Sequence, residues 1–231
     1  MKNFYILLCL ICFSVQAKYY KAVLTLENGT TKSGFAEMVE MGDSKVKFRL
    51  TEKGDTEKIL SEELKKIEYT EEENLFVAER LFIHTDKGEK GIKQGTKKYW
   101  LYVAYSNGIK LAVDVYRSTL RYNAINGTTT GAGGGTVLYM GKEKEDGVFF
   151  IFYLSDMMSV NVGMDKAVRR HAELLFKDCP KFLEAVNAEN FKKPTLANRL
   201  VELYETNNCN KPAKAPAKTE VKKKNSPKKK K

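Results

Sequence analysis

The stretch YYKAVLTLENGTTKSGFAEMV, residues 19–39, decides the fold class that we predict for this chain. Residues 19–26 alternate between apolar and polar side chains, which is the two-residue period of a half-buried strand. Asn28 and Gly29 form a dipeptide typical of tight hairpin turns, and residues 31–39 resume the strand pattern. The stretch therefore predicts a β-hairpin.

The next thirty or so residues continue the strand pattern in short pieces. Residues 44–50 alternate cleanly and place Val46, Phe48 and Leu50 on one face. A turn at 53–55, a short strand at 56–60, a turn or helical cap at 61–63 and a closing strand at 64–69 follow. Five short strands with tight turns are typical of a small, strongly bent barrel of the SH3-like or Sm-like kind.

The middle of the chain is also predicted to be β-structure, because its apolar runs are rich in β-branched and aromatic residues. Residues 74–84 form one strand candidate. Residues 99–105 and 109–116 flank the turn Ser106-Asn107-Gly108 as a hairpin. The remaining predicted segments are a loop at 85–98, a Gly/Thr-rich loop at 126–135, strands at 136–140 and 148–154, and a possible strand at 159–162.

After residue 163 the period changes to that of helices, with Met164, Val168, His171 and Leu175 on one face. Cys179-Pro180 suits an N-cap followed by a first-turn proline, so a second helix is expected at 181–186. A third helix opens at Pro194-Thr195, with an apolar stripe of Leu196, Leu200, Leu203 and Tyr204. The predicted class is α+β, mostly antiparallel, with about three C-terminal helices. The predicted segments are an export signal at 1–17, a barrel at 18–70, hairpins at 71–163, helices at 164–210 and a disordered basic tail at 211–231.

Residues 1–17 have the pattern of a signal peptide. Lys2 precedes an apolar run over residues 4–15, and Val15 and Ala17 occupy the two positions that signal peptidase reads. The run is shorter than the roughly 18 residues that a membrane span needs. We expect an exported product, periplasmic or secreted, with no transmembrane segment. A buried N-terminal element and a lipid-modified cysteine remain alternatives.

The formal net charge of +11 is concentrated at the C-terminus. Residues 211–231 hold ten lysines and one glutamate, a net of +9, and Lys2 lies in the signal, which leaves only +1 for residues 18–210. The basic composition is therefore no sign of a specific nucleic-acid-binding fold. We expect an anionic envelope surface or an acidic polymer as the partner, although a tail that binds nothing is the alternative. The candidate contact residues are Lys222, Lys223, Lys224, Lys228, Lys229, Lys230 and Lys231.

Two cysteines, Cys179 and Cys209, remain after the signal. In an exported chain an even pair indicates a disulfide first, with free thiols or intermolecular pairing as alternatives. A metal site is not expected, because the only histidines, His84 and His171, have no ligand-like spacing to these cysteines. No cofactor is predicted.

The segments LENGTTKSGFAEM, KVKFRL and KILSEELKKIEY between residues 26 and 69, and LLFKDCPKFLEAV at 174–186, carry a resemblance. The chain resembles a group of small secreted proteins of Bacteroidetes, mostly uncharacterised. In that group the first segment is similar to a small barrel, and Asp-Cys-Pro is a recurring landmark. The resemblance implies a fold and a compartment. It brings no catalytic residues.

Few residues suggest chemistry. Tyr99, Trp100 and Tyr102 could stack on a ligand, with burial on both faces as the alternative. Asp114 lies in an apolar strand, and we expect it to face solvent. The glycines at 131–135 lack the lysine and helix of a phosphate loop. The sequence thus favours a non-enzymatic exported binding or envelope-associated protein; the alternative is a hydrolase of envelope polymers with an unrecognised active site.

Overall fold

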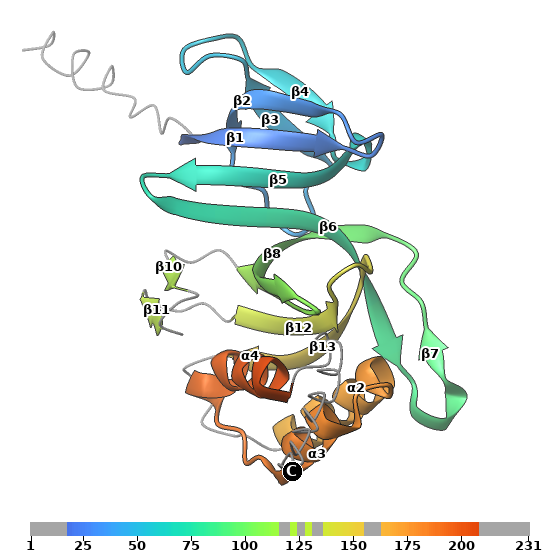
Figure 1. The fold of residues 1–231 in the computed structure, drawn as a ribbon. Coiled ribbons are helices and arrows are strands. Elements are labelled where there is room, and N and C mark those ends of the chain that lie inside the picture. The colour runs from blue at the N-terminus through green and yellow to red at the C-terminus, as the bar shows by residue number, and fades with distance from the viewer. Residues whose placement is uncertain (1–17, 116–120, 124–127, 131–135, 155–162, 208–231) are drawn as a thin grey trace, which may run out of the picture.

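The computed structural model describes residues 18–115, 121–123, 128–130, 136–154 and 163–207. It is an α+β fold, rich in antiparallel strands and with three C-terminal helices, as the sequence predicted. The elements are stacked in three levels along the long axis of the molecule (Figure 1). A small barrel lies at one end, a second group of strands lies in the middle, and the helices close the other end.

The barrel is built from five consecutive strands in the order β5-β1-β2-β3-β4. A single 3₁₀ turn, Ser61–Glu63, joins β4 to β5. Gly34 allows β2 to cross closely over β3, because a Cβ at this position would lie 2.3 Å from the carbonyl oxygen of Arg49. The strand bounds are β1 Tyr19–Leu26, β2 Thr31–Glu37, β3 Lys45–Arg49, β4 Glu57–Leu60 and β5 Leu64–Glu71.

The alternation of β3 places Val46 and Phe48 in the barrel core, as predicted. Leu50 was predicted to share this face, and that prediction is wrong: β3 ends at Arg49, and Leu50 is 73% exposed. The period of two holds only while the chain stays extended, and here it turns toward β4. The cluster that fills the barrel comprises Ala22, Leu24, Ala36, Val39, Val46, Phe48, Ile59, Leu64, Ile67, Tyr69, Ala78 and Trp100.

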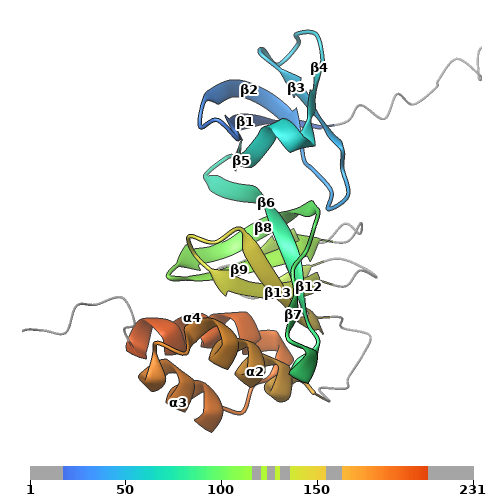
Figure 2. The same cartoon turned by 90° about the vertical axis from the view of Figure 1, so that its right-hand side faces the viewer.

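The strand β6, Asn74–Asp86, connects the barrel to the rest of the molecule (Figures 1 and 2). Its residues 74–79 pair with β5 of the barrel, and its residues 77–82 pair with β8. Its end pairs with the short strand β7, Ile92–Lys93, inside a segment that was predicted to be only a loop. One long strand therefore belongs to both halves of the molecule.

The middle level is a ring of five paired strands: β6, β8, β9, β12 and β13. Residues 147–149 of β13 pair in parallel with residues 82–84 of β6 and so close the ring. Gly147 makes this closure possible, because a Cβ there would lie 2.1 Å from Nε2 of His84. The bounds are β8 Lys98–Asn107, β9 Ile109–Val115, β12 Thr136–Lys142 and β13 Gly147–Leu154; a separate pair is formed by β10 Arg121–Asn123 and β11 Thr128–Thr130.

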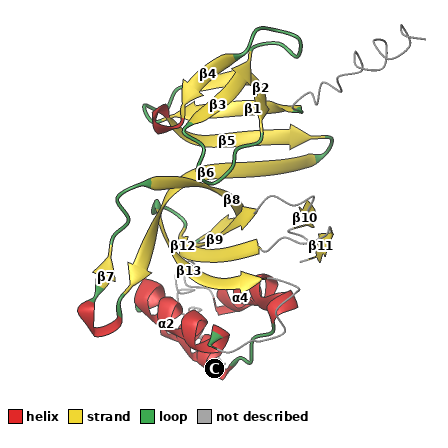
Figure 3. Ribbon diagram, turned by 180° about the vertical axis from the view of Figure 1, so that it is seen from behind, coloured by secondary structure: helices red, strands yellow, loops and turns green. Residues whose placement is uncertain are grey.

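The helices α2 Met164–Phe176, α3 Pro180–Ala188 and α4 Leu196–Asn207 cover the outer face of the ring (Figure 3). The predicted stripes of α2 and α4 are buried, and Cys179 is the N-cap of α3 with proline in its first turn. Burying a large apolar side chain contributes about 1.5–3 kcal/mol, so this interface stabilises both layers. In the part of the chain that is described, no helix is long and apolar enough to cross a membrane.

Candidate functional site

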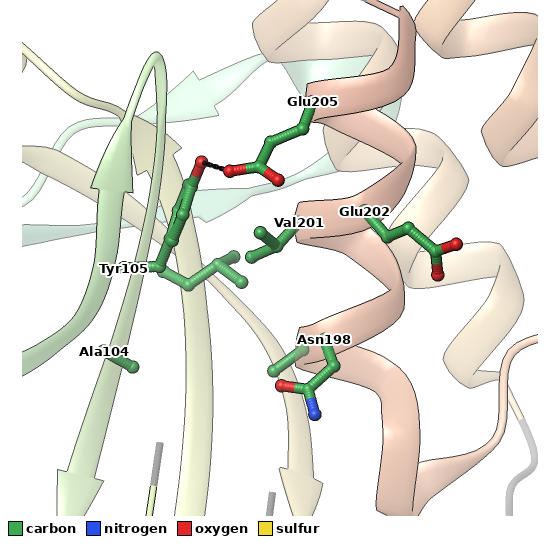
Figure 4. A pocket seen from close by; sticks show the side chains of 8 residues that line it. Ala104, Tyr105, Asn198, Val201, Glu202 and Glu205 are labelled. Atoms are coloured by element: carbon green, nitrogen blue, oxygen red, sulfur yellow. Dashed lines mark hydrogen bonds between the residues drawn. The ribbon is translucent and has the colours of Figure 1, made fainter. Parts of the chain in front are cut away.

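A shallow groove lies between the end of β8 and α4 (Figure 4). A β-bulge at Ala104 shifts the register, so that Tyr105 pairs with Leu111 on the side of the sheet that faces the helices. The Tyr105 hydroxyl donates a hydrogen bond of 2.7 Å to Oε1 of Glu205. The groove is lined by Ala104, Tyr105, Leu111, Ala197, Asn198, Val201, Glu202 and Glu205.

Both carboxylates of this groove, Glu202 and Glu205, have partners within the protein. Burial and the hydrogen bond to Glu205 raise the pKa of the Tyr105 phenol to about 12. Glu202 points away from Tyr105 and forms an ion pair of 2.6 Å with Arg199 (Figure 4). The volume of about 240 Å³ is below the roughly 300–1,000 Å³ of typical ligand sites. The groove is therefore best explained as a seam between sheet and helix.

A second group of polar and aromatic residues lies on the inner face of the ring. Asp114 is only 7% exposed, so the expectation that it faces solvent is wrong. Asp114 and Ala112 point into the ring, whereas Val113 between them packs toward the helices. Burial raises the pKa of the Asp114 carboxyl, and the nearby Glu40 carboxylate raises it further.

The register of the strands places aromatic side chains on the same face as Asp114. Asp114 lies opposite Val137, and Val137 lies opposite Tyr153 in the next strand. One row along, Tyr139 lies opposite Phe150, and their rings meet edge to face at 6.3 Å. Phe150 is 48% exposed and Tyr153 41% exposed, which is unusual for large side chains on the inner face of a β-structure. We name Tyr139, Phe150 and Tyr153 the aromatic face.

The sequence did not point to the aromatic face, although the run GVFFIFYL is conspicuous. A second β-bulge, between Leu138 and Tyr139, changes the pairing so that Ile151 has no partner. This extra residue brings Phe150 and Tyr153 to the same side, whereas strict alternation would place them on opposite sides. A one-residue irregularity of this kind has no clear signature in composition or spacing.

The predicted stacking residues lie elsewhere. Trp100 is 1% exposed in the barrel core, and its indole N–H donates to Oγ of Ser61 at 3.0 Å. The Tyr102 hydroxyl donates to the carbonyl oxygen of Val39 at 2.8 Å. Burial, the alternative that the sequence left open, thus describes Trp100, which offers no ring face to a ligand. Tyr99 lies beside Lys97, whose ammonium is 5.4 Å from the ring centroid.

The two histidines flank Phe149. The His171 ring lies 5.3 Å from it and the His84 ring 5.4 Å. Burial lowers the pKa of His171, and the nearby Asp86 opposes this shift. Nδ1 of His84 accepts a hydrogen bond from the backbone N–H of Gly95.

These histidines do not form an acid–base site with Asp114. His171 is influenced by Asp86 and Arg170, whereas Asp114 is influenced by Glu40. The hydrolase alternative needs these groups in one cleft, but the charged groups that shift the pKa of His171 are not the one that shifts the pKa of Asp114. Among the described residues, no three His, Cys, Asp or Glu side chains are placed to hold a metal ion.

Some predicted residues lie outside the described part of the chain. Cys179 is 7% exposed and belongs to the core beneath the helices. Cys209 and the tail lysines 222–224 and 228–231 fall outside the described residues. The pairing of Cys179 with Cys209 and the contacts of the tail therefore stay predictions.

Comparison with known proteins identifies no relative. A scan of protein-family models matches nothing in this chain, and searches of curated proteins and of solved structures find no significant match either. The case for a function therefore depends on the charges, burial and contacts of this chain alone.

Proposed function

We propose that this chain is an exported, non-enzymatic binding protein of the cell envelope. The barrel, the ring and the helices serve as a scaffold, and the tail at residues 211–231 contacts an anionic surface. Candidate surfaces share one chemistry, a dense array of phosphate or carboxylate groups.

This proposal rests on one difference between the body and the tail: many positive side chains of the body have acidic partners, whereas the tail has almost no acidic residues. Among the described residues, many cations of the body are matched by an acid of the same body, whereas the tail has one glutamate for ten lysines. The ion pairs of the body include Lys18–Glu71, Lys32–Glu57, Lys47–Glu37, Lys66–Glu68, Lys98–Glu27, Lys98–Asp146, Lys110–Glu79, Arg170–Asp86 and Arg199–Glu189.

The tail has enough charge for such a contact. Each lysine near an anionic membrane contributes about 1 kcal/mol, and the attraction is screened over a Debye length of about 10 Å at 0.1 M salt. The net charge of +9 in 21 residues therefore supports binding at low salt and release at high salt.

Export and the disulfide are parts of the same proposal. Residues 1–17 would be removed, so the exported protein would begin at Lys18, which a terminal mass measurement checks. The helix α4 ends at Asn207, two residues before Cys209, and Cys179 begins α3. A Cys179–Cys209 bridge would join these two helix ends. The resemblance to secreted Bacteroidetes proteins supports the same compartment.

The proposal is tested by co-sedimentation with vesicles at low ionic strength. We expect the mature chain to bind vesicles rich in phosphatidylglycerol and not vesicles of an uncharged glycolipid, which has neither a negative charge nor a methylated ammonium group. Deleting residues 211–231 should abolish binding, and high salt should do the same. Unchanged binding after the deletion would contradict the tethering role.

A matched pair of variants separates the tail from total charge. Seven Lys→Gln changes at tail residues 222–224 and 228–231 should remove most of the binding. Seven Lys→Gln changes on the body remove the same amount of charge and should leave most of the vesicle binding intact. The body changes use exposed lysines without an ion pair in the described structure: Lys45, Lys53, Lys58, Lys65, Lys90, Lys93 and Lys97.

A further inference from the structure

The inner face of the ring carries two features that an anionic-surface tether does not use. The first is the exposed aromatic pair, Phe150 and Tyr153, on one strand. The second is Asp114, which is more than nine-tenths buried and lies on the same face. Large exposed aromatic side chains and buried carboxyls are each uncommon, and their coincidence on neighbouring strands calls for a physical reason.

Asp114 lacks a partner in the described structure. It makes no hydrogen bond or ion pair with any described residue, and its charged neighbour, Glu40, has the same sign. Tyr139 is near enough to Asp114 for the carboxylate to help raise the pKa of its phenol to about 12. Among the described residues, the only fully buried side-chain N or O atom without a partner is Nε of Arg169, so solvent still reaches the Asp114 carboxylate. A positive group on this face would be attracted to that carboxylate in a partly desolvated setting.

The spacing defines the size of that group. Asp114 and Tyr153 are opposite the same residue, Val137, from the two neighbouring strands. Strands two positions apart in a sheet are about 10 Å apart. The half-buried Val137 lies between the Asp114 carboxylate on one side and the Tyr153 ring on the other. A trimethylammonium group is of a size to fit this gap, and aromatic rings attract such cations.

We infer that this face binds a small organic cation with a methylated ammonium group, with Asp114 as its counter-ion and Phe150 and Tyr153 as its aromatic walls. This site is separate from the tail: it would bind a cation, whereas the tail is proposed to bind an anionic surface. A quaternary ammonium fits better than a primary one, because the aromatic walls supply no ring of hydrogen-bond acceptors.

The experiment is a calorimetric titration of the full-length mature protein with choline chloride at neutral pH. We expect saturable binding that Asp114→Asn weakens about tenfold or more and that Phe150→Leu weakens several-fold. A neutral molecule of the same shape, 3,3-dimethyl-1-butanol, should bind at least about tenfold more weakly than choline, because it lacks the charge.

The controls keep the outcome decisive. Leu75→Ala removes an even more exposed apolar side chain, 63% exposed, on the barrel half of β6 and should leave choline binding unchanged. Thermal unfolding checks that each variant is folded, and Phe150→Leu lies at an exposed position, so it reports even if Asp114→Asn does not fold. No saturable choline binding, equal binding of the neutral alcohol, or undiminished binding by the folded variants overturns the inference. Vesicle binding through the tail is a separate measurement, so either proposal can fail alone.

Discussion

In the described part of the chain, the barrel core, with 12 buried residues, is smaller than the core beneath the helices, with 20, and the two also differ in how far apart in the sequence their residues lie. The barrel core is formed by consecutive strands joined by tight turns, with Trp100 added from β8. The helix-side core joins residues from Ile109 to Tyr204 and depends on three helices that follow the last strand. Nearby contacts cost less loop-closure entropy than distant ones. We therefore expect the barrel to be the more robust half.

The two cores are also connected. Tyr102 packs against both of them, and β6 belongs to both sets of strand pairings. A change in one core can therefore reach the other through a single strand. The following predictions measure how separate the two halves are.

The largest effect is expected from Phe182→Ala in α3. Phe182 is 0% exposed, and its ring lies 5.2 Å from Tyr204 and 5.3 Å from Phe176. Removing it should lower the free energy of unfolding by about 3–5 kcal/mol, because a cavity remains. Urea unfolding followed by far-UV circular dichroism measures the loss, and Trp100 fluorescence should shift less, because Trp100 lies in the barrel.

The control for this variant is Leu174→Ala on the exposed side of α2, where the side chain is 37% exposed. It should cost less than about 1 kcal/mol. If both probes move together in Phe182→Ala, the two cores unfold as one unit and the expected separation is wrong.

The next effect concerns the proposed Cys179–Cys209 bridge, which has no counterpart in the barrel because residues 18–73 contain no cysteine. Breaking it should destabilise the helix-side core by about 2–4 kcal/mol. Mass spectrometry of the non-reduced exported protein should detect the linked peptides. Two freely alkylated thiols would refute the bridge.

A smaller effect is expected from Ser61→Ala in the barrel. Ser61 is 3% exposed; its Oγ accepts from the Trp100 indole and donates to the carbonyl oxygen of Asp43 at 2.7 Å. The variant leaves a buried indole N–H without this acceptor and should cost about 1–3 kcal/mol, with a change in the Trp100 emission. Ser33→Ala, at an exposed position of β2, is the control; equal stabilities of the two variants would argue against the role given to Ser61.

The smallest effect is a pH dependence confined to the helix side, since residues 18–73 have no histidine. Burial lowers the pKa of His171 in the folded protein; the hydrogen bond to the Ala167 carbonyl and the Asp86 carboxylate oppose this shift, and Arg170 adds to it. The unfolded chain therefore binds the proton more readily, and stability should fall as the pH drops below about 6.5. Unfolding at about pH 7.5 and 5.5 should show this loss in the wild type, and His171→Leu should reduce it. An unchanged pH dependence in that variant would exclude His171 as its source.

Much of the fold followed from local patterns. The alternation of residues 45–49 and the Asn28-Gly29 turn predicted the barrel strands, because each depends only on neighbouring residues. The helical stripe ending at Leu175 was equally clear. The limit of such patterns is seen at Leu50, where the strand ended one residue before the pattern did.

The candidate site was much less predictable than the fold. Asp114 was expected on the solvent face, and Trp100 was a stacking candidate, yet both are buried. Alternation states which side chains share a face, but not what covers that face. The bulges at Ala104 and near Leu138 then change which residues lie on the same face of the sheet.

By itself, the sequence determined the strands of the barrel, the helical stripes, the N-cap at Cys179 and the concentration of charge in residues 211–231. Each of these depends on residues within about one turn or one strand of one another. Only the tertiary structure decided that β6 joins two halves, that β13 closes a ring against it at Gly147, and that Asp114 is buried on the same face as Phe150 and Tyr153. Those outcomes depend on which distant strands pair and on where bulges shift their register, and local periodicity does not identify either.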